Sequence, residues 1–346
     1  MKTRLTLVVV SLLLSVLIGL SLGQHGAGDA GPRKGKVRIG LSLDTLKEAR
    51  WQADRDMFVR RAGELGATVE VLSANGDDTV QIGDVEKLIT SGVDVLVIVP
   101  HDGTAMAKAV RLAHEAGISV IAYDRIIRDV DLDLYVSFDN VRVGELQGRF
   151  VADHLPQQKP ARIVRIYGAK TDNNASQFKA GQDSVIDPLV KTGAIAVVHE
   201  DWAEDWKPEN AKRIVNAAIT AKGPRIDAVL ASNDGTAGGA VQALAEEGLA
   251  GKVLVTGQDA DLVALQRIAT GTQAMTIYKP LHTLAQGAAE LAVKMATGKP
   301  VIARHTVNNG AIDVPSVLFD VVTVTSSNIE ATVVKDGLYR REEIFR

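Results

Sequence analysis

The strongest constraint on the fold is a regular alternation of short apolar runs with longer amphipathic runs, which starts at Lys36. Residues 93–100 are apolar almost throughout, as is typical of a strand buried on both faces of a parallel sheet. Residues 50–65 instead carry apolar side chains at helical spacing and are followed by Gly66, a residue that suits a helix C-terminus. The alternation therefore predicts an α/β fold built on parallel sheets.

The alternation runs twice along the chain, with a restart near residue 141. The expected strands cover 37–43, 69–73, 93–100, 119–123, 135–138, 162–167, 194–199, 227–231, 253–256, 274–278 and 317–324. The expected helices cover 50–65, 80–90, 104–115, 141–154, 175–191, 208–221, 236–247, 262–270 and 281–296. Two such series predict two doubly wound sheets. The length of 346 residues agrees with two domains, because a domain has about 150 residues on average.

Composition excludes several classes of function. The chain has 39 basic and 42 acidic residues, so it lacks the basic excess of a nucleic-acid-binding protein. It contains no cysteine, which excludes disulfides, thiolate metal sites and cysteine nucleophiles. The histidines show no metal-ligand spacing, and no glycine-rich phosphate-binding motif is present. We therefore expect neither a metal nor a cofactor.

The N-terminus has the pattern of an export signal. Lys2 and Arg4 precede an apolar run over 5–22, which ends at the small residues Ser21 and Gly23. We expect a signal peptide over 1–23, cleaved near Gly23, and a disordered leader over 24–35. The apolar run is almost as long as the about 20 residues of a membrane helix, so an uncleaved anchor is the alternative.

Polar and aromatic residues follow almost every predicted strand, where open parallel sheets bind ligands. Carboxylates and amides can accept from and donate to hydroxyl groups, and an arginine can hold two hydroxyls at once. A tryptophan offers a flat face to a sugar ring. Asn233 and Asp259 have an alternative role as helix N-caps. Together these residues indicate a concave site for a small polyhydroxylated ligand. They include Arg50, Trp51, Asp124, Arg125, Asn174, Trp202, Trp206, Asn233, Asp259 and Lys279.

Several segments together resemble the periplasmic sugar-binding proteins of the ribose/galactose type, the type I periplasmic binding proteins. The resemblance runs from about Lys36 to Gly337 and is greatest to the members that bind D-xylose for ABC transporters. The segments are Glu48-Ala49-Arg50-Trp51-Gln52, Ser73-Ala74-Asn75-Gly76, Ala122-Tyr123-Asp124-Arg125, Ser137-Phe138-Asp139-Asn140, Asp172-Asn173-Asn174-Ala175, Ala231-Ser232-Asn233-Asp234, Gly257-Gln258-Asp259-Ala260-Asp261 and Thr276-Ile277-Tyr278-Lys279-Pro280.

The resemblance implies two lobes joined by a three-stranded hinge, with the ligand in the cleft between them. The N-terminal lobe would comprise 36–140 and 280–309, and the C-terminal lobe 141–279 and 310–346. The chain would cross between the lobes near Asn140, Lys279 and Asn309. The implied ligand-binding residues, with Trp206 preferred to Trp202, are Arg50, Trp51, Asp124, Arg125, Asn174, Trp206, Asn233, Asp259 and Lys279.

The implied function is high-affinity binding of D-xylose by a periplasmic monomer. The sugar would be delivered to the membrane permease of an ABC importer by hinge closure, without catalysis and without nucleic acid. Another pentose or hexose is the alternative ligand. A sugar-responsive repressor would need an N-terminal helix-turn-helix in place of the export signal. A secreted sugar-acting enzyme also stays open, with Asp124 and Asp259 as an acid–base pair facing each other across the cleft.

Overall fold

The computed structural model describes residues 35–346 except 157, 158 and 224. The predicted signal peptide at 1–23 lies outside the described residues, as does the predicted leader up to residue 34. Within the described part of the chain, no helix is both long and apolar enough to cross a bilayer.

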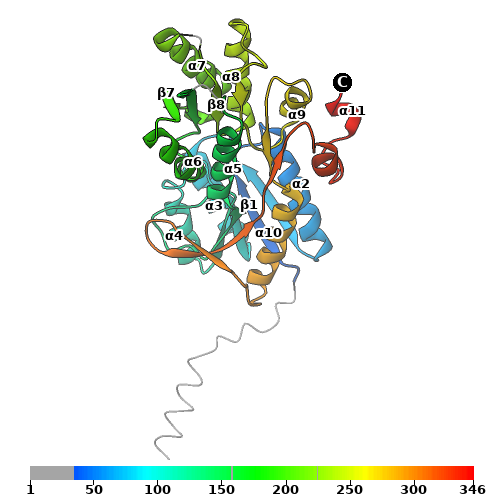
Figure 1. Ribbon diagram of the computed structural model, residues 1–346. Coiled ribbons are helices and arrows are strands. Elements are labelled where there is room, and N and C mark those ends of the chain that lie inside the picture. The colour runs from blue at the N-terminus through cyan, green and yellow to red at the C-terminus, as the bar shows by residue number, and fades with distance from the viewer. Residues whose placement is uncertain (1–34, 157–158, 224) are drawn as a thin grey trace, which may run out of the picture. The chain divides into compact units, whose positions relative to one another are not determined.

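Seven strands form the first sheet in the order β11-β12-β5-β4-β3-β1-β2 (Figure 1). They are β1 (Arg38–Leu43), β2 (Thr68–Ser73), β3 (Val95–Val99), β4 (Ser119–Tyr123), β5 (Leu134–Phe138), β11 (His305–Asn308) and β12 (Asp313–Phe319). Neighbouring strands are parallel except β11 and β12. Every residue of β3 is buried, because helices pack on both faces of the sheet.

Four helices cover this sheet. One face packs against α2 (Ala49–Glu64) and α10 (Leu281–Ala296), which lie side by side. The other face packs against α3 (Asp78–Ser91) and α4 (Ala107–Glu115). Successive strand residues contribute to opposite clusters, as Val97 does to the first and Ile98 to the second. This alternation follows from the two-residue period of a strand.

Four parallel strands form the second sheet in the order β7-β6-β8-β9. They are β6 (Ala161–Tyr167), β7 (Ile195–Trp202), β8 (Ala228–Ala231) and β9 (Leu254–Val255). The apolar side chains between this sheet and its helices form two clusters. The helices are α5 (Asn140–Asp153), α6 (Asn173–Lys191), α7 (Pro208–Lys222) and α8 (Asp234–Glu246).

The remaining elements complete the second half of the fold. A two-stranded antiparallel pair joins β10 (Thr276–Tyr278) to β13 (Val322–Val324). The helices α9 (Leu262–Ala269) and α11 (Arg341–Ile344) share an apolar cluster with β10. Two doubly wound, mainly parallel sheets confirm the predicted fold class.

The chain passes between the two halves in three places. It leaves the first sheet after β5, returns to it through α10 after β10, and leaves it again after β12. The first passage lies between β5 and α5, which begins at Asn140, and the second lies between β10 and α10, where Lys279 stands. The third differs from the crossing predicted near Asn309, because Asn309 lies in the turn of the β11–β12 hairpin, where Gly310 has a φ of 101°.

The predicted lobe boundary after residue 309 is therefore too early. Residues 313–319 form β12, which pairs with β5 in the first sheet rather than joining the C-terminal lobe. The single strand predicted over 317–324 is in fact the end of β12 and the whole of β13, separated by Asp320 and Val321. The other boundaries of the two lobes stay predictions.

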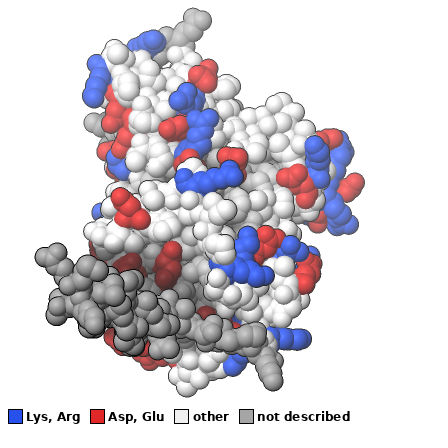
Figure 2. All heavy atoms as spheres, turned by 90° about the horizontal axis from the view of Figure 1, so that it is seen from below, with Lys and Arg blue, Asp and Glu red and all other residues white. Residues whose placement is uncertain are grey.

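Charged side chains on the face shown in Figure 2 are mixed in sign. Basic and acidic groups lie beside each other there, so this face presents no extended basic field of the kind that attracts a polyphosphate chain.

Two glycines bring α5 and α6 into backbone contact. A Cβ atom added to Gly144 would lie 2.0 Å from the carbonyl oxygen of Phe178, and one added to Gly181 would lie 2.0 Å from that of Val141. No side chain fits at either position. The contact matters for the site described below, because the first turn of α6 carries Asn174.

We predict that Gly181→Ala lowers the free energy of unfolding by about 1–3 kcal/mol, because the methyl group forces α5 and α6 apart. Gly83→Ala in α3 is the matched control, since nothing lies within 4 Å of its added Cβ. The control should raise stability by about 0.5–1 kcal/mol, as alanine usually does in a helix. Denaturant unfolding of both variants measures the difference, and equal effects would contradict the packing argument.

Candidate functional site

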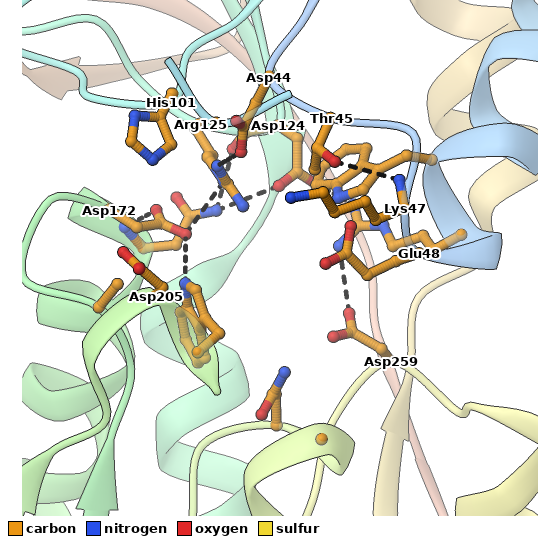
Figure 3. A pocket seen from close by; sticks show the side chains of 18 of the residues that line it. Asp44, Thr45, Lys47, Glu48, His101, Asp124, Arg125, Asp172, Asp205 and Asp259 are labelled. Carbon is orange, nitrogen blue, oxygen red and sulfur yellow. Dashed lines mark hydrogen bonds and ion pairs between the residues drawn. The ribbon is translucent and has the colours of Figure 1, made fainter. Parts of the chain in front are cut away.

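A cavity of about 540 Å³ lies between the carboxyl ends of strands from the two sheets. Its wall includes all nine residues predicted from the sequence, of which Asp124, Arg125 and Asp259 are labelled in Figure 3. Arg50, Trp51, Asp124 and Arg125 come from the half that holds the first sheet, and Asn233 and Asp259 from the other. The fold thus brings residues that follow different strands, more than 200 positions apart, to one pocket, as the pair Arg50 and Asp259 shows.

Arg50, in the first turn of α2, joins both sides of the pocket. Its Nε donates to Asp54 at 3.3 Å and its Nη1 to Asp259 at 3.1 Å, while Nη2 donates to Asp124. Burial lowers the pKa of Arg50, but these three carboxylates outweigh it and raise the pKa well above its ordinary value. Arg50 is therefore a permanent cation at the centre of the site. Asp54 itself has its pKa raised to about 6 by burial, which the charge of Arg50 only partly offsets.

Asp124 follows β4 in a left-handed conformation, with a φ of 64°. Its carbonyl oxygen accepts from the hydroxyls of Tyr135 at 2.9 Å and Ser137 at 2.7 Å, which hold this turn in place. Its carboxylate accepts from Asn174 Nδ2 at 3.2 Å, on the opposite side of the pocket. Burial raises the pKa of Asp124, but Arg50, Lys279 and Arg125 outweigh it, and the net pKa is below the ordinary value.

Arg125 lies between two carboxylates. It donates to Asp44 at 2.8 Å and pairs with Asp172 at 3.1 Å, so it too links the two halves (Figure 3). Its guanidinium carbon lies 5.4 Å from the centre of the Trp51 ring, and that of Arg50 lies 4.4 Å away. Trp51 is 5% exposed. It therefore supports the two arginines by cation–π contact and also lines the pocket.

Trp206 provides an aromatic wall on the other side. It ends the short helix η1 (Glu204–Trp206), and both Asp205 and Trp206 have left-handed φ values, 52° and 58°. Its indole Nε1 donates to Asp172 at 3.2 Å. A Cβ at Gly168 would lie 2.0 Å from the ring, so the ring position requires glycine there. Trp202 packs instead on Tyr167, with ring centres 5.0 Å apart, and does not line the pocket.

Lys279 and Asp259 form an ion pair in the wall of the pocket. Lys279 is 2% exposed, and its Nζ lies 2.9 Å from Asp259 Oδ1. Asn233 caps α8, because its Oδ1 accepts from the backbone nitrogen of Thr236 at 2.8 Å. The alternative role of Asn233 as a helix cap is thus correct, and the same residue lines the pocket. Asp259 caps no helix, since Asp261 precedes α9.

The predicted set omitted two carboxylates that organise the site. Asp172 caps α6 and also accepts from Arg125 and Trp206. Asp54 anchors Arg50. Asp172 stands in the loop between β6 and α6, immediately before the helix, and Asp54 stands four residues after Arg50 in one helix. Both signals are readable in the sequence.

The charge pattern suits a neutral, hydroxyl-rich ligand. The half-buried Arg50 and Arg125 and the buried Lys279 each already pair with a carboxylate. Lys47 and Lys207, which also line the pocket, are exposed to water. Paired carboxylates still have lone pairs that accept hydroxyl hydrogens. An acid–base pair for hydrolysis would need one carboxyl protonated. Asp124 does not fit the role of the protonated acid, because its pKa is below the ordinary value.

Comparison with known proteins identifies the family. The model of the periplasmic binding protein domain matches residues 39–300. The D-xylose-binding periplasmic protein of Escherichia coli is 49% identical over 309 residues, covering 89% of this chain and 93% of that protein. Its namesake in Haemophilus influenzae is 47% identical, covering 89% and 92%.

Solved structures agree with the family match. A carbohydrate transporter solute-binding protein from Chloroflexus aurantiacus, in complex with D-glucose, is 34% identical and has a TM-score of 0.84. The match covers 90% of this chain and 98% of that one. The fold and the pocket between two sheets agree with these matches. The chain belongs to the family of periplasmic binding proteins.

Proposed function

We propose that this protein binds D-xylose with high affinity in the periplasm and delivers it to an ABC-type importer. The observation that carries the proposal is the Arg50 network, which places Asp124 and Asp259 from opposite sides on one guanidinium. Relatives of 49% and 47% identity that are named for D-xylose support the choice of sugar. In this proposal residues 1–23 are a cleaved signal peptide and the mature protein is a monomer.

Binding would proceed by hinge closure. The sugar first contacts one half, and contacts from the other half then stabilise the closed state. Three contacts already join the halves across the pocket, namely Arg50 with Asp259, Arg125 with Asp172 and Asn174 with Asp124. Closure removes water from these groups, so each must find a partner on the sugar or in the protein.

Selectivity would follow from the same desolvation. A sugar with a missing or misplaced hydroxyl leaves a buried donor or acceptor unpaired, which costs about 1–3 kcal/mol. D-glucose is the second candidate ligand, because a structure of 34% identity holds it. The two sugars differ in the hydroxymethyl group at C5, which the closed pocket has to accommodate or exclude.

We predict that Trp206→Ala abolishes D-xylose binding in isothermal titration calorimetry while the protein stays folded by circular dichroism. The ring forms one wall of the pocket and is half-buried. Trp202→Ala is the matched control, since Trp202 does not line the pocket, and it should bind D-xylose as the wild type does. Unchanged affinity in Trp206→Ala would show that the indole does not contribute to D-xylose binding.

Asp259→Ala should weaken D-xylose binding at least 100-fold, because it removes a ligand acceptor and leaves the buried Lys279 without its carboxylate. Asp205→Ala is the control: Asp205 also lines the pocket but pairs with the exposed Lys207 at 2.8 Å. Its affinity should change less than threefold. Calorimetry that shows equal losses in the two variants would contradict the role given to Asp259.

A calorimetric panel tests the choice of sugar. D-xylose should bind at least tenfold more tightly than D-ribose, L-arabinose or D-glucose, since one unpaired buried group is worth about 1–3 kcal/mol and 1.4 kcal/mol is a factor of ten. Tighter binding of another sugar would reject D-xylose. Product analysis after incubation with a xyloside should show no turnover, and turnover would favour the enzyme alternative.

A further inference from the structure

A buried polar cluster lies behind the part of the pocket wall that carries Asp259. At its centre is Asp234, the first residue of α8, which is 1% exposed. Oδ1 of Asp234 accepts from Gln273 Nε2 at 2.8 Å. Oδ2 accepts from Thr276 Oγ1 at 2.9 Å and from the backbone nitrogen of Asp261 at 3.0 Å. Asp234 does not line the pocket itself, so any effect on a ligand must act through other residues.

The segment that Asp234 holds is strained. Asp259 and Ala260 both lie in the left-handed region, with φ values of 101° and 56°. Non-glycine residues keep such conformations only where their surroundings enforce them, and such sites gather at ligand-binding positions. The conformation decides where the Asp259 carboxylate points, and therefore whether it meets Arg50 and Lys279 at 3.1 and 2.9 Å.

Three successive backbone nitrogens fix this segment. That of Asp259 donates to the carbonyl oxygen of Ile277 at 2.8 Å. That of Ala260 donates to Thr276 Oγ1 at 3.2 Å, and that of Asp261 donates to Asp234 Oδ2. Because the Thr276 hydroxyl donates in turn to Asp234 Oδ2, two of the three bonds depend on one carboxylate oxygen.

The backbone around Asp234 strengthens the link. Its nitrogen donates to the carbonyl oxygen of Gln258 at 2.9 Å, and its carbonyl accepts from Arg267 Nη2 at 2.8 Å. A Cβ at Gly257 would lie 2.0 Å from Asp234 Oδ1, so the carboxylate lies directly against the 257–261 segment. Contacts thus reach the segment at Gly257, Gln258 and Asp261.

A buried carboxylate here is not explained by packing. Burial raises the pKa of Asp234 well above its ordinary value, and the charge of Asp261 raises it further. A well-packed apolar residue at such a position is often as stable or more so. A role in placing the segment gives the carboxylate a reason to be present.

We propose that Asp234 is a positioning residue, which holds the 257–261 segment so that the Asp259 carboxylate meets Arg50, Lys279 and the bound sugar. The proposal rests on the proposed function in one respect, that the pocket binds D-xylose. Its structural part, the control of the Asp259 conformation by Asp234, stands apart from the identity of the ligand.

Three variants test it by calorimetry with D-xylose, well below their unfolding temperatures. Asp234→Ala removes all three acceptor contacts and should weaken binding at least tenfold. Asp234→Asn keeps one oxygen that can serve Thr276 and Asp261, and it should recover most of that loss. Asp84→Ala, a buried aspartate in α3 that is 4% exposed and pairs with Lys87, controls for lost stability and should bind within twofold of wild type.

Affinity within threefold of wild type in a folded Asp234→Ala would overturn the proposal, as would an equal loss in Asp84→Ala. If Asp234→Ala does not fold, Thr276→Val decides instead. This variant keeps the shape of the buried Thr276 and removes only the hydroxyl between Ala260 and Asp234. It should bind about fivefold more weakly, and unchanged binding would overturn the proposal.

Ligand-free crystal structures separate this proposal from the proposed function. Asp259 should leave its left-handed conformation in Asp234→Ala, or in Thr276→Val if only that variant folds. The same conformation as in the wild type would refute the positioning role whatever the pocket binds. A wild-type protein that binds no D-xylose would contradict the proposed function alone.

Discussion

The two halves of the site are joined by the interaction of one half-buried cation with three carboxylates. Arg50 pairs with Asp54 in its own helix, with Asp124 beyond β4 and with Asp259 beyond β9. Removing such groups from water is costly unless each is paired. The two halves therefore have to approach closely enough for Arg50 to reach all three carboxylates. Closure of the pocket and pairing of these charges consequently occur together.

Backbone conformation supports this arrangement on both sides of the pocket. Asp124, Trp206 and Asp259 all have left-handed φ values, and hydrogen bonds from buried side chains or backbone hold each of the three. Strain of this kind is tolerated where a rigid scaffold over-determines the loop. The parallel sheets are that scaffold, and the loops at their carboxyl ends carry the binding groups.

Much of the fold was predictable from the sequence, because a buried strand or helix face shows as a periodic pattern of apolar residues. The continuously apolar strand β3 and the periodic helix α2 are predictable for that reason, and the nine predicted residues that line the pocket all come after predicted strands. The β11–β12 hairpin was not predicted, since most of β11 is exposed and lacks apolar alternation. The pairing of Asp172 with Arg125 and Trp206, and the contact of Trp51 with Arg125, join distant segments, which no local pattern records.

The central claim is that the pocket between the two sheets holds D-xylose through groups from both halves. A crystal structure of the mature protein with D-xylose tests it most directly. We expect the sugar in the cavity, with its hydroxyls hydrogen-bonded to Asp124 from one half and to Asp259 from the other, and its ring against Trp206. A sugar bound elsewhere, or held by residues of one half alone, would contradict the account.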